Sequence, residues 1–272
     1  MQAPSALATP DVWNDVAAGY AEEVAPILEH YARDALRFAR LPDRAHILDV
    51  AAGPGTLALL AAADVEHVVA IDFAQEMVQE LERRIAASGV SNIEVIRANG
   101  QTLPFEEARF DGVFSIFGLI FFPDRPAGFR EAYRVLKPGR RAVVSSWAPL
   151  DKVPLLRACF GTLGDALPEL PFGDETPPLA EVADFRDEMA GAGFADVEIR
   201  TVQHTIYVPS VSAFWEANVR SSAPLTLLRK NLNADQWAEL GAKVVTSLER
   251  EFGRGPIEST WPAHIGVGTR PA

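Results

Sequence analysis

The sequence has little cysteine and no concentration of positive charge, and both absences limit its function. A single cysteine, Cys159, among 272 residues excludes an internal disulfide framework and a cysteine-based zinc site. Lysine and arginine number 25 against 37 aspartates and glutamates, and no basic stripe is present that would neutralise a phosphate backbone. No pair of histidines has the spacing of a metal site. We therefore expect a protein that binds neither nucleic acid nor metal.

Long hydrophobic runs are missing as well. The longest one, residues 113–122, is interrupted by Ser115 and Gly118 and has about half of the roughly 20 residues that cross a bilayer. The first ten residues lack the basic region and apolar core of a signal peptide. Hydrophobic residues make up 48% of the chain and charged residues 23%, as in ordinary globular proteins. These features predict a globular, cytoplasmic protein that makes no contact with a membrane.

From residue 45 onwards, short β-branched runs alternate with amphipathic stretches. Such alternation predicts right-handed crossovers and a mainly parallel sheet. Two late strands are separated by a long helical stretch, which predicts a hairpin that carries a helical insertion. The fold class is therefore α/β, with a Rossmann-like seven-stranded sheet whose last strand is antiparallel. The expected strands are residues 46–50, 65–72, 93–98, 112–117, 141–147, 197–208 and 257–269.

Helical periodicity predicts helices over residues 11–40, 74–88, 182–192 and 211–252. Pro26 is expected to break the first of them and to begin a second helix. Residues 137–139 read as a turn before a strand, and the proline-rich residues 167–178 as a loop. The expected organisation is a helical lid (1–40), a Rossmann-like core (41–149), a loop with a helix and the sixth strand (150–210), a helical cap (211–254) and the last strand (255–272).

The turn after the first strand has the features of a ligand-binding site. The strand leads into Gly53-x-Gly55 and then a helix, and glycine allows the backbone to approach a ligand closely. Asp49, just before the turn, would repel a phosphate and attract an ammonium or sulfonium group. Asp72 ends the second strand, where a carboxylate can accept both ribose hydroxyls. The implied ligand is an adenosine with a cationic amino-acid arm, a description that S-adenosylmethionine fits.

Several motifs in this order resemble the class I S-adenosylmethionine-dependent methyltransferases, in particular the group related to ubiquinone/menaquinone biosynthesis methyltransferases. The N-terminal Tyr-Asp…His signature of the quinone-pathway members is not matched, because Tyr20 is followed by Ala21. The resemblance implies S-adenosyl-L-methionine as cofactor and S-adenosyl-L-homocysteine as product. The motifs that carry it are residues 49–56, 70–72, 99–105, 110–115 and 134–139, with a further match at 190–197.

The resemblance also implies which residues hold the cofactor. Asp49 should hold the methionine part, Asp72 the ribose, and Asn99 the polar edge of the adenine. Ala51 stands where the family usually has glycine, and we expect its backbone to keep a negative φ. Asn99 replaces the more usual aspartate, and its oxygen can still accept a bond from the adenine amino group. The implied cofactor residues are Tyr20, Asp49, Ala51, Gly53, Gly55, Asp72, Phe73, Met77, Asn99, Gly100, Gln101, Ser115 and Phe117.

The methyl acceptor is expected to be a small, largely apolar or aromatic molecule, because the flanking helical segments bring tryptophan and leucine with few paired charges. Trp13 and Tyr20 are the best candidates to contact it. No compelling general base is present, so alignment of the reactants should dominate. His204 and Tyr20 are the candidate catalytic residues, although the alternation of His204 with Val202 and Ile206 favours core packing.

Two other functions remain open from the sequence. A non-catalytic S-adenosylmethionine-binding protein would keep the same binding residues. An NAD-dependent oxidoreductase would use a similar glycine turn, but Asp49 beside the phosphates and the lack of a Tyr-x-x-x-Lys pair count against it.

Overall fold

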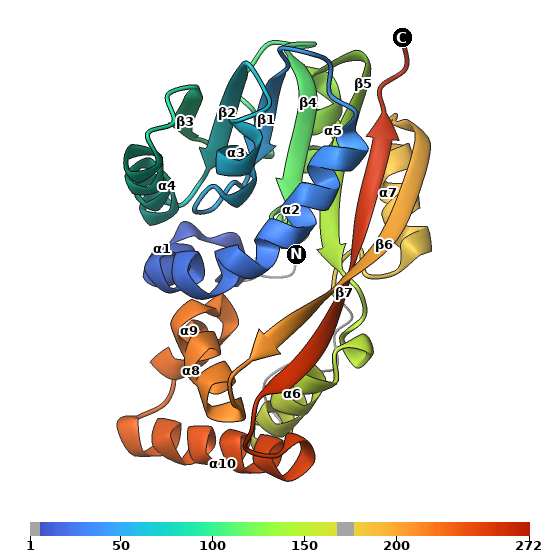
Figure 1. The fold of residues 1–272 in the computed structure, drawn as a ribbon. Coiled ribbons are helices and arrows are strands. Elements are labelled where there is room, and N and C mark those ends of the chain that lie inside the picture. The colour runs from blue at the N-terminus through green and yellow to red at the C-terminus, as the bar shows by residue number, and fades with distance from the viewer. Residues whose placement is uncertain (1–5, 168–176) are drawn as a thin grey trace.

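Seven strands form one sheet in the order β3-β2-β1-β4-β5-β7-β6, seen in the computed structural model, which describes residues 6–167 and 177–272 (Figure 1). Strands β1 to β5 are parallel, and β7 runs antiparallel to both of its neighbours. The predicted fold class is thereby confirmed. The strands are β1 (His46–Val50), β2 (His67–Asp72), β3 (Ile93–Arg97), β4 (Phe110–Ile116), β5 (Leu136–Trp147), β6 (Ala195–Val208) and β7 (Ile257–Thr269).

Helices cover both faces of the sheet and form a separate lobe beyond its lower end (Figure 1). Among the described residues, no helix is long and apolar enough to span a membrane. The α-helices are α1 (Pro10–Gly19), α2 (Ala25–Ala39), α3 (Thr56–Ala61), α4 (Gln75–Ser88), α5 (Arg125–Val135), α6 (Pro154–Ala166), α7 (Val182–Gly191), α8 (Val211–Ser221), α9 (Ala223–Lys230) and α10 (Ala234–Phe252).

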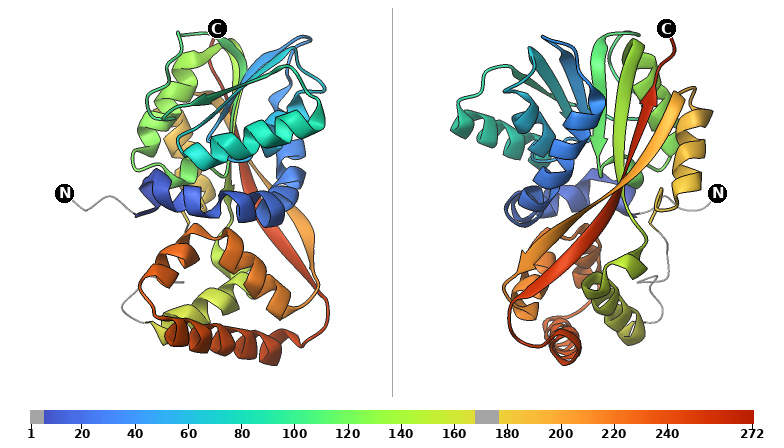
Figure 2. Two further views of the ribbon diagram at one scale, coloured as in Figure 1. Left: turned by 90° about the vertical axis from the view of Figure 1, so that its left-hand side faces the viewer. Right: turned by 45° about the vertical axis from the view of Figure 1, so that its right-hand side comes forward.

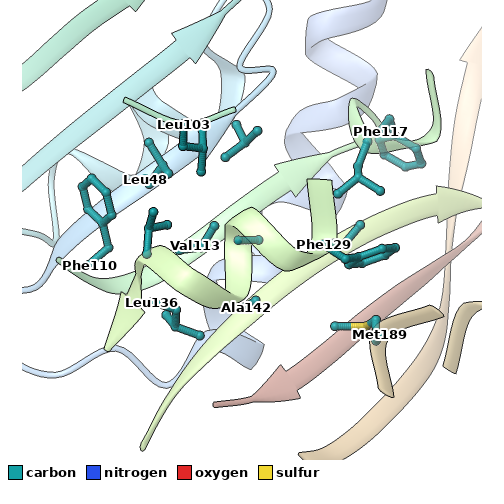
Figure 3. Close-up of a cluster of buried hydrophobic side chains, with 14 of the residues drawn as sticks. Leu48, Leu103, Phe110, Val113, Phe117, Phe129, Leu136, Ala142 and Met189 are labelled. Atoms are coloured by element: carbon teal, nitrogen blue, oxygen red, sulfur yellow. The ribbon is translucent and has the colours of Figure 1, made fainter. Parts of the chain in front are cut away.

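The sheet separates two hydrophobic clusters, because successive strand residues point to opposite faces. Leu48 packs with Phe129 and Met189, which α5 and α7 bring to one face (Figure 3). The adjacent residue, Ile47, packs on the other face with residues of α2 and α3. Both faces of the central strands are therefore buried, which explains their nearly continuous apolar sequences.

The N-terminal helix changes its winding before the predicted break. Residues Tyr20–Val24 form one π-helical turn between α1 and α2, and the backbone N–H of Ala25 donates to the carbonyl of Tyr20. Pro26 has no N–H to donate to the carbonyl of Glu22, so the α-helical pattern fails just before it. The break is thus real but lies one turn earlier than Pro26, which sits in the first turn of α2.

The long hairpin of β6 and β7 extends beyond the core and carries the lower lobe, which we call the cap (Figure 2). The segment predicted as one helical stretch, 211–252, is divided into α8, α9 and α10. Ser222 and Asn233 separate these helices, because each side chain caps the helix that follows it. The cap also contains α6, which the sequence pattern did not predict. Helix α1 lies between core and cap and contacts α4, α8 and α9.

Two smaller expectations need comment. Residues 137–139 do not precede β5 but form an irregularity within it, since Leu136 pairs with Phe110 and the regular pairing resumes at Arg141. Gly139 there has φ of +75°. Of the loop predicted at 167–178, residues 168–176 lie outside the described part of the chain.

We predict that Gly55→Ala destabilises the protein more than Gly139→Ala. Both glycines have a positive φ, of +81° and +75°, so both substitutions cost about 1 kcal/mol of backbone strain. A methyl group at Gly55 would lie 2.0 Å from Cδ1 of the buried Leu81, whereas Gly139 has open space around it. Overpacking should add about 1–3 kcal/mol at Gly55 alone. Equal midpoints of urea unfolding for the two variants would contradict this packing argument.

Candidate functional site

A pocket lies at the carboxyl ends of the central strands. The strand order reverses between β1 and β4, and such a switch point opens a crevice at the ends of parallel strands. We call this cavity the switch-point pocket. Its wall is formed by the turn after β1, the ends of β2 and β4, the segment after β3, and aromatic residues from α1 and from the 3-10 turn Leu119–Phe121.

All but two of the predicted cofactor residues line the switch-point pocket. The exceptions are Gly55 and Ser115. Gly55 caps the start of α3 and packs against Leu81. The Ser115 hydroxyl is buried and accepts a hydrogen bond from the backbone N–H of Leu119 at 3.1 Å, so it braces the turn after β4. The aromatic Phe122 also lines the pocket, although no motif pointed to it.

Asp49 is a buried carboxylate with an unused oxygen. Its side chain is at the bottom of the pocket, and Oδ2 is the one buried side-chain polar atom without a hydrogen-bond partner among the described residues. Burial raises the pKa of Asp49 to about 8, the backbone N–H of Ala58 lowers it, and the nearby Asp72 charge raises it further. A cation placed against Oδ2 would remove the cost of ionising this group.

Asp72 connects the glycine turn to the next helix. Its Oδ2 accepts the N–H of Gly53 and its Oδ1 accepts the N–H of Ala74, both at 2.9 Å. Burial raises its pKa to about 6, against the lowering effect of these backbone bonds. The carboxylate thus braces the turn and still has lone pairs for hydroxyl donors in the pocket, because each oxygen accepts one of these bonds.

The expectation that Ala51 keeps a negative φ is wrong. Its φ is +55°, in the left-handed region that glycine adopts without strain. The chain must turn sharply here between β1 and α3, and Gly118 leaves room for the Ala51 methyl group, since a Cβ on Gly118 would lie 2.5 Å from it. The alanine therefore adopts the backbone conformation that glycine would adopt here, and this conformation is strained for alanine.

Asn99 mainly stabilises its own turn. Its Oδ1 accepts the backbone N–H of Gln101 at 2.9 Å, a typical Asx turn. Gln101 in turn accepts the N–H of Asp124 through Oε1. Both side chains line the pocket. Gly100 between them approaches other groups closely, because a Cβ there would lie 2.5–2.7 Å from Phe122 and Val50.

A second cavity, which we call the cap pocket, adjoins the first. Trp13, Tyr20, Phe117 and Phe121 line both cavities and form an aromatic junction between them. Trp13 and Phe121 meet edge to face with ring centres 4.7 Å apart, and Phe117 stacks on Trp147 at 4.0 Å. The cap pocket has a cavity volume of about 540 Å³, and the switch-point pocket has one of about 120 Å³.

The wall of the cap pocket is mostly apolar and comes from both lobes. Beyond the aromatic junction, it is lined by side chains of α6, α8 and the β6–β7 hairpin. Among its apolar and aromatic members are Ile27, Trp147, Leu156, Phe160, Ile206, Phe214 and Trp261. Such a lining suits a small apolar molecule.

The structure does not bring His204 to either pocket. Its Nε2 lies 2.9 Å from Oδ2 of Asp34, and its ring stacks on His30 with ring centres 5.1 Å apart. It therefore joins β6 to α2, away from Asp49 and the aromatic junction. Tyr20, by contrast, lies at that junction.

Residues 47–139 match the methyltransferase domain family. A demethylmenaquinone methyltransferase of Clavibacter sepedonicus is 41% identical over 41% of this chain, but the match spans only 44% of that protein. A ubiquinone/menaquinone biosynthesis C-methyltransferase of Geotalea daltonii is 31% identical over 62% of this chain and 78% of that protein. The chain belongs to the family of class I S-adenosylmethionine-dependent methyltransferases.

Solved structures share the methyltransferase fold. A Bacillus halodurans protein superposes with a TM-score of 0.60 at 19% identity, over 89% of this chain and 99% of that one. A phosphoethanolamine N-methyltransferase of Haemonchus contortus, solved with S-adenosylhomocysteine, has a TM-score of 0.56 at 16% identity, over 89% of this chain and 53% of that one. At these identities the likeness shows the fold alone.

The pocket of this methyltransferase suits S-adenosylmethionine, its cofactor. The unused oxygen of Asp49 matches a cationic group, and Asp72 presents lone pairs for hydroxyls. Gly100 leaves space that a side chain would fill. The residues present therefore fit the cofactor that the family uses.

We predict that Asp49→Asn changes how the stability of the methyltransferase depends on pH. The carboxyl of Asp49 has a pKa of about 8 when folded and near 3.8 when unfolded, so its protonation stabilises the fold at low pH. This stabilisation is lost as the pH rises towards 8, by up to about 1.4 kcal/mol per pH unit. Protonation of Asp72 also stabilises the fold at low pH, but this contribution is lost by about pH 6.

Between pH 6 and 8, Asp49 is therefore the one of these two carboxyls that still makes stability fall with rising pH. In ligand-free protein, the difference in unfolding free energy between Asp49→Asn and wild type should move in favour of the variant across this window. Asp111→Asn is the control: burial would raise the pKa of Asp111, but the hydrogen bond from Lys137 lowers it overall. Its effect should be constant from pH 6 to 8. If the unfolding free energies of Asp49→Asn and wild type changed equally with pH across this range, the pKa assigned to Asp49 would be contradicted.

Proposed function

We propose that the protein transfers a methyl group from S-adenosylmethionine to a small, largely apolar or aromatic molecule held in the cap pocket. The observation that carries this proposal is the aromatic junction. Trp13, Tyr20, Phe117 and Phe121 border both cavities, so a ligand in one pocket can meet a ligand in the other only between these rings.

The proposed roles of the cofactor residues follow from their positions. Asp49 binds the cationic amino-acid arm through its free oxygen, and Asp72 accepts the ribose hydroxyls. Phe73 and Met77 pack against the adenine, and Asn99 with Gln101 borders its polar edge. The cofactor supplies a methyl group already activated on a sulfonium. The protein then has to hold the acceptor in line with it.

Alignment carries most of the catalysis in this proposal, since well-oriented reactants gain on the order of 7–11 kcal/mol. Burial and the charge of Asp72 raise the pKa of Tyr20 far above its usual range, so its hydroxyl stays neutral and can only donate or accept a hydrogen bond. His204 is bound to Asp34 outside the cavities, and it has no part in the proposed step.

The relatives named above include quinone-pathway enzymes, and a quinol would suit the aromatic cap pocket. The missing Tyr-Asp…His signature leaves that particular acceptor unsupported for this chain. We therefore propose the acceptor class and no individual acceptor.

We predict that calorimetric titration detects binding of S-adenosylmethionine and S-adenosylhomocysteine at micromolar concentration and no binding of NAD. Asp49→Asn should weaken both S-adenosyl ligands by about 10- to 100-fold, because a buried charged partner is lost. Asp64→Asn, at an exposed aspartate away from the pocket, is the control and should bind as wild type. Binding of NAD alone would contradict the assigned cofactor, and full affinity in Asp49→Asn would contradict the role of Asp49.

A second prediction concerns the acceptor. With S-[methyl-³H]-adenosylmethionine, wild-type protein should label organic-extractable small molecules of a cell extract and should leave the tRNA, DNA and protein fractions unlabelled. A reaction without protein is the blank for this assay. Label confined to a macromolecular fraction would contradict the proposed acceptor class, because the proposal places the acceptor in the cap pocket between the two lobes.

A further inference from the structure

The described wall of the cap pocket contains few charged side chains. They are Glu23 from the π-helical turn and Glu216 and Arg220 from α8. Glu216 is exposed, and the side chain of Arg220 is 49% exposed, whereas that of Glu23 is only 27% exposed. Glu23 is thus the least exposed charged group on a mostly apolar wall.

Arg220 holds Glu23 by one oxygen only. Its Nε donates to Oε1 at 3.1 Å, and its Nη2 donates to the same Oε1. Oε2 accepts no hydrogen bond from any described residue. The support is rigid, because α8 lies directly against the N-terminal helix: a Cβ on Gly19 would lie 2.2 Å from the carbonyl oxygen of Arg220. The result is an oriented carboxylate with a free oxygen.

Glu23 also lies next to the junction of the two pockets. Tyr20, which lines both cavities, is three residues before Glu23 in the same π-helical turn. Both residues line the cap pocket, so Glu23 faces the cavity that opens at the junction. Neither the exposed Glu216 nor His204 combines burial with this position.

Resting on the proposed function, we infer that Glu23 binds a hydroxyl group of the methyl acceptor and takes its proton. The acceptor is then a hydroxylated aromatic molecule. Its O–H donates to Oε2 of Glu23, while its ring lies among the aromatic side chains of the cap pocket. Arg220 is a positioning residue that holds the Glu23 carboxylate through Oε1 and leaves Oε2 for the acceptor.

The step balances in atoms and charge. As the acceptor oxygen forms its bond to the methyl carbon, the sulfur–methyl bond breaks and the sulfur keeps the electron pair. The hydroxyl proton passes to Oε2 of Glu23. A cationic sulfonium, a neutral phenol and a carboxylate thereby become a neutral thioether, an aryl methyl ether and a carboxylic acid, with no further reactant.

The test compares two probes of similar shape, 2-naphthol and 2-methylnaphthalene, in the presence of S-adenosylhomocysteine. Dissociation constants are measured at pH 7 by quenching of tryptophan fluorescence, since Trp13, Trp147 and Trp261 line the cap pocket. Wild type should bind 2-naphthol about tenfold more tightly, the size expected for one hydrogen bond to a charged group. Glu23→Gln should lose that preference and keep its affinity for 2-methylnaphthalene.

Glu22→Gln is the matched control, because Glu22 is the adjacent acid, exposed and outside the pocket wall. It should keep the wild-type preference. With S-adenosylmethionine and 2-naphthol, Glu23→Gln should lower kcat by at least tenfold.

The outcomes separate this inference from the proposed function. Equal binding of both probes to wild type, or an undiminished preference in Glu23→Gln, would overturn the role of Glu23 and leave the aromatic acceptor pocket standing. Loss of the preference in Glu22→Gln as well would show an effect of net charge and would also overturn it. If wild type binds neither probe, the proposed aromatic acceptor itself fails, and the inference fails with it.

Discussion

The carboxylate of Asp72 fixes the geometry on which the rest of the site depends. By accepting the N–H groups of Gly53 and Ala74, it joins the turn after β1 to the start of α4. A buried carboxylate has to find such donors, because its desolvation is costly. The same bonds hold the glycine turn open above Asp49, whose carboxylate is left with an unused oxygen. Asp72 therefore satisfies its carboxylate within the fold, whereas one oxygen of Asp49 has no partner among the described residues.

The core of this architecture could be predicted from the sequence because it rests on local rules. Alternation of β-branched and helical segments gave the strands, and the spacing of Asp49, Gly53 and Asp72 gave the carboxyl ends that meet in the pocket. The same local rules placed Gly55 and Ser115 among the cofactor residues, but neither of them lines the pocket. A motif shows that a residue is needed, but it does not show whether the residue faces the ligand or braces the turn behind it.

The features that the sequence did not show depend on contacts between distant segments. The π-helical turn results from the placement of Pro26, but its consequence, Glu23 beside Arg220, requires α8 to dock some 200 residues later in the chain. Likewise, the methyl group of Ala51 has room only because Gly118, opposite to it, has no side chain. Helix α6 begins at Pro154, which suits the first helical position, and it packs against α10 in the cap.

The β6–β7 hairpin has a consequence for how such a chain can change. Val208 and Ile257 are paired partners, so the polypeptide leaves the sheet and returns to it at neighbouring points. The helices between them supply a large part of the cap pocket without contributing a strand to the core. A change in the number or length of these helices therefore leaves the pairing of β6 with β7 intact, because both ends of the segment lie at one point of the sheet.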